Sequence, residues 1–562
     1  MMKRKLIGLA FLLAPLFTFA QDFPMQKIEI SDWNLPSTGW IKTGEVNALS
    51  YLKATAANNG TVLLAKNAAG KISTKNSYGD LKVSFDFLQS AEAQAEIILQ
   101  NEVRIALNGT KEKLPSGTIL KTTGYQLPTQ NATKKAGLWQ HAEVIFNTAK
   151  SAGELANVQK VSINGITVLE NIMIPIANTK SVNYPMVIKA ISGTSAFKNF
   201  EFLTFEQKKP VSIANLSYTI TETEGWQTDY KPTGKTTAKT ASELTANVPN
   251  EFREFLMTFK GTLNAKEAGL YAFTMDYQGV GKLYIDGNLV AGGPDIEFRR
   301  PITGLVELAA GNHDFTYEYR RTWWRPAFGL FVSGPDFRPY ALHAANALPV
   351  AQMPDGIFVN VNGTVARTIR SFMNFKGEKR TEVISVGTPQ KVNYAFDLAN
   401  GSLLMLWKGD FVDATEMWHE RGEPQILSPL GMTTETAGTP TFYTGSKPLD
   451  SVDVYKEMVF KSYQLDEAGL PTFTHSLNGI SITQKFEPYN SGLKATVKAN
   501  GGGIKHVLIS ADKIEPLSAT SYLAGDKIID ILGGPKASVI SKDGKDYLVA
   551  LCGNTLTYSI NW

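Results

Sequence analysis

Residues Leu81-Lys82-Val83-Ser84-Phe85-Asp86-Phe87 alternate apolar and polar side chains without interruption. A period of two is typical of a half-buried β-strand, because successive side chains point to opposite faces of a sheet. The same alternation returns along the chain, at 141–146, 161–163, 271–275 and 282–285. Long helical periodicity is nearly absent, and 413–421 is the best short helix. The sequence therefore predicts an all-β protein.

Turn signals separate these strands. They are the dipeptides Asn108-Gly109, Asn164-Gly165, Asp286-Gly287 and Asn478-Gly479. Asn-Gly or Asp-Gly between alternating segments favours a two-residue β-hairpin, since both residues must adopt positive φ. We expect three consecutive β-sandwich or jelly-roll domains.

Composition limits the class of protein. The chain has 562 residues, 43% of them hydrophobic and 19% charged, which excludes intrinsic disorder for most of its length. One cysteine, Cys552, excludes a disulfide scaffold and a cysteine-based zinc site. No later segment is apolar over the roughly 18 residues that a membrane-spanning helix needs, so we expect no membrane span.

The first twenty residues have the pattern of a secretory signal peptide. A basic segment, Lys3-Arg4-Lys5, precedes an apolar stretch from Leu6 to Phe17 and a small-residue exit, Thr18-Phe19-Ala20, after which we expect cleavage. Without those three basic residues, 53 Lys and Arg face 52 Asp and Glu, a net charge of +1. Nothing in this balance points to nucleic acid as a partner. We expect an exported protein, periplasmic or extracellular.

Proline-containing joints divide the remaining chain. Lys208-Lys209-Pro210 follows one strand-rich segment, and a second joint lies at 349–354. The predicted domains are 1–20 for the signal peptide and then 21–207, 208–350 and 351–562.

The first domain resembles the 3-keto-disaccharide hydrolase family, whose domain is a concanavalin-like jelly roll. Four motifs carry the resemblance, in order: 71–83 with its Tyr-Gly-Asp, Gly-Leu-Trp-Gln at 137–140, Asn-Gly at 164–165, and the closing strand 196–202. The resemblance implies a domain that acts on glycosides.

The family's pocket is lined by an Asn-Ser-Gly strand and a following strand that carries Glu and Gln. The corresponding segments here, 93–98 and 103–109, lack both elements. Glu96 and Arg104 are the only ionisable residues on them and are the candidate catalytic residues, because acid–base catalysis needs positioned proton-transfer groups. His141 is interpreted as a packing or surface residue. These departures favour binding over catalysis.

The second domain resembles the carbohydrate-binding domain shared by bacterial protective antigen and many glycosidases. The motifs are 268–273, Leu-Tyr-Ile-Asp-Gly at 283–287, and Gly-Asn-His at 311–313. Relatives of this kind often hold calcium with an Asp-Asp pair. Only Asp276 stands at that position here, so calcium-dependent sugar binding is not predicted.

An arginine–tryptophan run stands in the same domain, formed by Arg320, Arg321, Thr322, Trp323, Trp324 and Arg325. Indole rings pack against the C–H faces of sugars, and guanidinium groups donate to hydroxyls or carboxylates. The run is therefore a candidate carbohydrate-binding platform. The alternative is one core tryptophan beside a solvated, arginine-rich edge.

The third domain resembles a domain of large exported bacterial proteins that carry haem-binding or sugar-dehydrogenase-like domains. Its motifs are 380–397, 406–414 and Trp418-His419-Glu420-Arg421. Asp413, Glu416 and Glu420 would share a face of the short helix and could hold a divalent cation, and His419 with Glu420 could supply acid and base. The alternative is a solvated helix face. No other cofactor is implied.

These observations predict an exported carbohydrate-binding or accessory protein in glycan or glycoside breakdown. The alternatives are a glycosidase-like enzyme that cleaves 3-keto-glycosides through the first domain, and a structural or adhesive envelope protein. Function depends on the site and not on the fold, so these three functions must be distinguished by the structure of the site.

Overall fold

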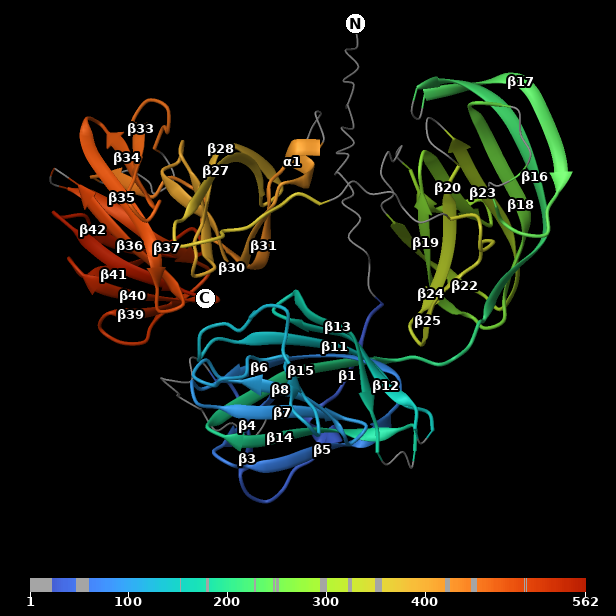
Figure 1. The fold of residues 1–562 in the computed structure, drawn as a ribbon, viewed down its shortest axis with the longest axis horizontal. Helices are drawn as coiled ribbons and strands as arrows, with labels where there is room; N and C mark the ends of the chain where they lie inside the picture. The colour runs from blue at the N-terminus through green and yellow to red at the C-terminus, as the bar shows by residue number, and fades with distance from the viewer. Residues whose placement is uncertain are drawn as a thin grey trace, which may run out of the picture. The chain divides into compact units, whose positions relative to one another are not determined.

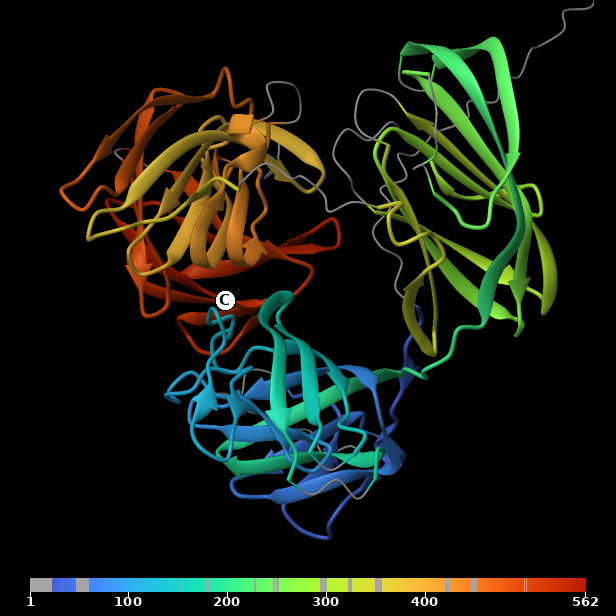
Figure 2. The same ribbon diagram turned by 45° about the vertical axis from the view of Figure 1, so that its right-hand side comes forward.

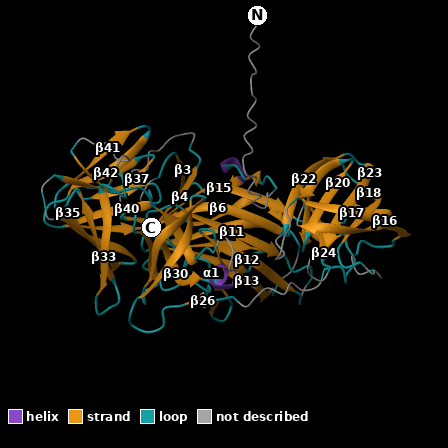
Figure 3. Ribbon diagram, turned by 90° about the horizontal axis from the view of Figure 1, so that it is seen from above, coloured by secondary structure: helices purple, strands orange, loops and turns teal. Residues whose placement is uncertain are grey.

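The computed structural model describes residues 23–46, 60–151, 153–177, 181–226, 229–245, 248, 252–293, 301–321, 326–348, 356–419, 425–445, 452–499, 501 and 503–562. Strands make up most of the described chain (Figure 3), which confirms the predicted all-β class. Two compact units are present: Leu203–Met353 forms one, and Gln26–Phe202 together with Pro354–Trp562 forms the other. The predicted signal peptide, 1–20, lies outside the described residues.

Two antiparallel sheets form the first domain (Figure 1). The first sheet runs, in spatial order, β13 (Ile166–Pro175), β12 (Leu155–Ile163), β11 (Gln140–Asn147), β6 (Leu81–Gln89), β15 (Thr194–Thr204), β4 (Val62–Lys66) and β3 (Trp40–Thr43), and β1 (Gln26–Lys27) also pairs with β15. The second runs β10 (Tyr125–Gln126), β9 (Ile119–Leu120), β8 (Val103–Asn108), β7 (Gln94–Leu99), β14 (Tyr184–Ser192), β5 (Gly70–Tyr78) and β2 (Trp33–Asn34). A 3₁₀ turn, η1 (Ile30–Asp32), precedes β2.

Alternation along β6 determines what lies between these sheets. Val83, Phe85 and Phe87 are fully buried, and Phe85 stacks on Phe200 with ring centroids 5.1 Å apart. The intervening side chains of Lys82, Ser84 and Asp86 therefore lie on the outer face of the first sheet.

The second domain is also a two-layer sandwich. Its larger sheet runs β17 (Asp229–Thr240), β16 (Val211–Trp226), β18 (Phe255–Ala265), β23 (Gly311–Arg321), β20 (Val280–Ile285) and β21 (Asn288–Gly292). The smaller runs β22 (Ile302–Leu308), β19 (Gly269–Tyr277), β24 (Phe328–Gly334) and β25 (Phe337–Ala341). Tyr317 and Phe328, with ring centroids 4.9 Å apart, pack the two layers together. The long β16 and β17, in green, form one edge of the larger sheet (Figure 2).

Three antiparallel sheets make up the third domain. The first runs β26 (Phe358–Val359), β30 (Ser402–Asp413), β29 (Val392–Asp397), β28 (Glu378–Gly387) and β27 (Arg367–Phe375), with β31 (Ser428–Glu435) also paired to β30. The second runs β32 (Phe442–Thr444), β37 (Ile504–Ala511), β42 (Lys545–Leu551) and β41 (Ala537–Lys542). The third runs β33 (Met458–Leu465), β34 (Pro471–Leu477), β35 (Ile480–Tyr489), β36 (Gly492–Ala499), β43 (Leu556–Asn561), β40 (Lys527–Gly533), β39 (Ser521–Ala524) and β38 (Ile514–Pro516).

The eight-stranded sheet of the third domain packs against both of the others. Phe396 of β29 stacks on Phe473 of β34 with ring centroids 4.0 Å apart, and His506 of β37 packs against Tyr558 of β43. A buried polar pair thus lies in the middle of this core.

Three of the four predicted hairpin turns are confirmed. Asn164-Gly165, Asp286-Gly287 and Asn478-Gly479 all have positive φ at both residues, as a two-residue turn requires. The prediction is wrong at Asn108-Gly109, where neither residue has positive φ. There the Asn108 amide donates to the Leu114 carbonyl, and its backbone N–H donates to the Ser116 hydroxyl, so the residue anchors a longer loop.

The predicted short helix is α1, Thr415–His419, and Asp413 caps it by accepting the Thr415 N–H at 2.8 Å. Within the described part of the chain, no helix has the length and apolar character needed to cross a membrane.

Candidate functional site

Glu96 and Arg104, the candidate catalytic residues, form an ion pair on the outer face of the second sheet of the first domain. Glu96 lies opposite Ala106 and Arg104 lies opposite Ile98, so the two side chains are diagonal neighbours on one face. The guanidinium donates from Nε to Oε2 at 2.8 Å and from Nη2 to Oε1 at 2.6 Å. Hydrogen bonding to Glu96 raises the pKa of Arg104.

This pairing restricts what Glu96 can do. Its side chain is 3% exposed, and both of its oxygens accept guanidinium hydrogens. Lys189 of β14 lies directly opposite it and adds a second positive charge on the strand. A catalytic carboxyl group needs access to its substrate, and both oxygens of the buried Glu96 are already bound by Arg104.

A carboxylate–imidazole pair lies on the outer face of the first sheet, and sequence reasoning did not predict it. Asp86 of β6 lies opposite His141 of β11, and the His141 Nδ1 is 2.8 Å from Asp86 Oδ1. Asn199, which adopts positive φ in β15, donates from Nδ2 to Asp86 Oδ2 at 2.7 Å. The Asp86 carboxylate thus orients an imidazole whose side chain is 51% exposed.

Electrostatics keep Asp86 ionised. Burial raises its pKa, but hydrogen bonds from His141 and Asn199 outweigh burial, so the pKa lies below its ordinary value. A half-exposed imidazole held by an ionised carboxylate can accept or donate a proton, as in the acid–base pairs of many enzymes.

Glu143 continues the same polar face two residues beyond His141. It lies opposite Ser84, and its carboxylate contacts Lys82 at 2.9 Å and Lys160 at 3.1 Å. Burial raises the pKa of Glu143, but the two lysines lower it by more, so the pKa lies below its ordinary value and this carboxylate is also ionised. The face therefore offers both acceptors and donors to a hydroxyl-rich ligand.

An aromatic residue, Trp139, immediately precedes β11, the strand that carries His141 and Glu143. Trp139, partly buried, donates from Nε1 to the Val46 carbonyl at 3.0 Å, and the Lys198 Nζ lies 4.2 Å from the centroid of its ring. Indole beside polar groups is the pairing that sugars favour. We define the outer polar face as Asp86, His141, Glu143, Trp139 and Asn199.

In the second domain, the structure places Arg320 in the interior. Its side chain is 1% exposed, its guanidinium carbon lies 4.7 Å from the centroid of Tyr230, and Nη2 contacts Glu254 at 3.2 Å. The prediction of an exposed platform is therefore wrong for Arg320. Arg321 donates from Nη1 to the Arg253 carbonyl at 2.8 Å. Trp323, Trp324 and Arg325 lie outside the described residues and stay predictions.

The predicted cation site of the third domain is described only in part. Asp413 accepts the Thr415 N–H and Glu416 lies in the first turn of α1, while Glu420 and the His419 side chain lie outside the described residues. Among the residues that the structure describes, no group of three or more His, Cys, Asp or Glu side chains could hold a metal ion.

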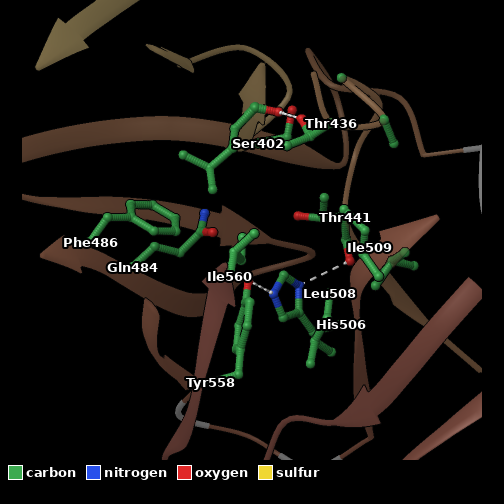
Figure 4. A pocket seen from close by; sticks show the side chains of 14 residues that line it. Ser402, Thr436, Thr441, Gln484, Phe486, His506, Leu508, Ile509, Tyr558 and Ile560 are labelled. Carbon is green, nitrogen blue, oxygen red and sulfur yellow. Dashed lines mark hydrogen bonds between the residues drawn. The ribbon is translucent and has the colours of Figure 1, made fainter. Parts of the chain in front are cut away.

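A small cavity in the third domain contains a histidine that sequence reasoning missed (Figure 4). His506 Nε2 lies 3.0 Å from the Tyr558 hydroxyl, and Nδ1 lies 3.3 Å from the Thr441 carbonyl. Burial lowers the pKa of His506 to about 4 even though the Thr441 carbonyl opposes it. The cavity has a volume of about 30 Å³. That space holds one or two waters and no sugar ring.

Comparisons with known proteins point to the first domain. The model of the 3-keto-alpha-glucoside-1,2-lyase-like domain family matches residues 30–203. No curated protein is significantly similar to the chain in sequence. The resemblance of the first domain to the 3-keto-disaccharide hydrolases is thus confirmed, and the resemblances of the two later domains stay predictions.

Several solved structures are similar over part of the chain. Two from Parabacteroides distasonis ATCC 8503, each titled "putative glycosyl hydrolase", are 17% and 13% identical and cover 32% and 31% of this chain and 95% of their own, with TM-scores of 0.23 and 0.18. An anti-sigma factor domain-containing protein from Clostridium clariflavum is 13% identical, with 48% and 100% covered and a TM-score of 0.19. The first domain, which carries both the Glu96–Arg104 pair and the outer polar face, is the part of this chain that is similar to the lyase-like family.

Proposed function

We propose that this is an exported carbohydrate-binding protein with an accessory role in the breakdown of glycans or glycosides. One observation carries the proposal: within the glycoside-related domain at 30–203, Glu96 and Arg104 neutralise each other. The domain keeps a sugar-related framework, while the carboxylate expected to do acid–base chemistry is closed off. Binding without turnover is the function that this arrangement supports best.

A second candidate function rests on the Asp86–His141 pair. In a 3-keto-glycoside, the C3 carbonyl acidifies the proton on C2. A base that removes this proton allows the C1–O bond to break, and the leaving oxygen takes up a proton. His141, oriented by Asp86 and half exposed, has the chemistry of such a base. This candidate makes the protein a lyase that acts at the outer polar face.

The experiment uses the full mature chain with pairs of plain and 3-keto-glycosides. Calorimetry measures binding, and chromatography of the released sugar measures turnover. The binding function predicts affinity for a glycoside, no released sugar, and no new activity on substitution Glu96→Gln.

A matched control separates the two candidates. His313 of the second domain also pairs with a carboxylate, Asp286, at 2.7 Å. If turnover occurs and His141→Ala abolishes it while His313→Ala does not, the lyase replaces the binding protein. If no glycoside of either kind binds, both candidates are wrong.

A further inference from the structure

A polar groove opens where the three sheets of the third domain meet. Its volume is about 510 Å³, within the range of about 300–1,000 Å³ usual for small-molecule sites. Strands β31, β37, β40 and β42 contribute to its wall. The charged residues that line it are Lys376, Glu435, Asp512, Asp526, Lys527 and Lys545.

Asp526 organises one side of this groove. Its Oδ1 lies 2.5 Å from the Lys527 Nζ, and its Oδ2 accepts the Thr434 hydroxyl at 3.0 Å. Lys134, from the loop before β11, lies 3.6 Å from the same oxygen. Lys527 is 8% exposed, so the pair is a built-in part of the wall and not a loose surface contact.

The charges of the groove balance. Three lysines and three carboxylates line the groove, Lys134 contacts Asp526 from outside this lining, and Thr433, Thr434, Thr436 and Ser510 add hydroxyl groups or backbone polar groups. An anion would meet the carboxylates and a cation would meet the ammonium groups, so neither gains from the groove as a whole. A neutral ligand with many hydroxyls can donate to the carboxylates and accept from the lysines.

We propose that this groove is a second sugar site and binds a neutral oligosaccharide of about disaccharide size. The proposal goes beyond the proposed function, because it gives the third domain a ligand of its own on residues far along the chain from the outer polar face. The ligand is recognised through hydrogen bonds to charged groups of the lining, among them Asp512, Asp526, Lys527 and Lys545.

The test titrates the full chain with maltose, cellobiose and xylobiose. The variant Asp512→Ala/Lys545→Ala removes one charge of each sign from exposed positions of the groove. The control Glu467→Ala/Lys498→Ala makes the same change at exposed positions outside the lining. We expect at least one disaccharide to bind, the groove variant to lose about tenfold or more in affinity, and the control to stay within twofold.

Two further measurements distinguish this site from the first-domain site and neutral ligands from charged ones. Asp526→Asn should weaken the same disaccharide by the same factor with or without His141→Ala in the same chain, so failure of the first-domain proposal is seen separately. A digalacturonate and a chitosan disaccharide probe for charged ligands. The proposal is overturned if only these charged sugars bind, if no neutral disaccharide binds, or if the groove variant and its control lose affinity equally.

Discussion

The Arg104 guanidinium holds the Glu96 carboxylate through two hydrogen bonds, 2.6 Å and 2.8 Å long, across β7 and β8. Glu96 is almost completely buried by this contact, although it stands on the outer face of its sheet. Both oxygens of the Glu96 carboxylate are therefore engaged by one guanidinium.

Removing Arg104 should destabilise the first domain. Leaving a buried charge without its partner costs about 3–5 kcal/mol, and because the Arg104 side chain is 41% exposed we expect about 2 kcal/mol for Arg104→Met. Glu96→Gln/Arg104→Met should recover most of this loss, since no charge is then left unpaired. Calorimetric melting of both variants measures the difference. A single variant as stable as the natural protein would contradict the pairing.

Asp86 should make stability depend on acid pH. Its pKa in the folded protein lies below the ordinary value of 3.8, so its ionised form stabilises the fold above that pH, and this contribution is lost as pH falls through the lowered pKa. Asp86→Asn should remove the contribution. We expect the gap in melting temperature between the natural protein and the variant to be constant from pH 5 to 7 and to close below pH 4. A gap that does not change with pH argues against an ionised Asp86.

His506 should produce acid sensitivity in a different range. Its pKa is about 4 in the folded protein and about 6.5 when unfolded, so the unfolded chain binds the proton first as pH falls. Folded-state stability is then lost progressively between pH 6.5 and 4, by about 3 kcal/mol in total. His506→Gln, which has no charge to gain, should reduce the pH dependence of stability in this range in urea-unfolding measurements. The neighbouring Tyr558→Phe should keep the pH dependence, because the histidine stays buried.

Arg320 should be needed for the second domain to fold. It packs under Tyr230, donates to the Gly225 carbonyl at 2.9 Å, and contacts Glu254. Arg320→Ala removes this buried contact and should cost about 3 kcal/mol. Arg321→Ala, next in the chain and more exposed, should cost less than about 1 kcal/mol. Equal melting temperatures for the two variants would show that Arg320 is not a structural residue.

Local patterns predicted much of the architecture. The alternation at 81–87 predicted β6, which spans Leu81–Gln89, and three of the Asn-Gly or Asp-Gly pairs form the predicted turns. These patterns succeed because they act between residues that are close together in the sequence. The turn predicted at Asn108-Gly109 does not form, because Asn108 hydrogen-bonds to Leu114 and Ser116 of the loop that follows.

The candidate site was harder to predict, because register is not visible in one strand. Asp86, His141 and Asn199 lie 55 and 58 residues apart in sequence, and the pairing of β6 with β11 and the positive φ of Asn199 in β15 bring them together. Similarly, the burial of Arg320 depends on Tyr230 of β17 and on Glu254, the residue before β18.

The sequence by itself determined the all-β class, the alternation that separates core from surface, and the likeness of the first domain to a glycoside-related family. Each depends on the order of neighbouring residues, which the chain carries in full. Only the tertiary structure decided that Glu96 is closed by Arg104, that Asp86 orients His141, and that six charged residues share one balanced groove. Those relations depend on strand register and sheet packing, which are set by the free energy of the whole core and not by any local segment.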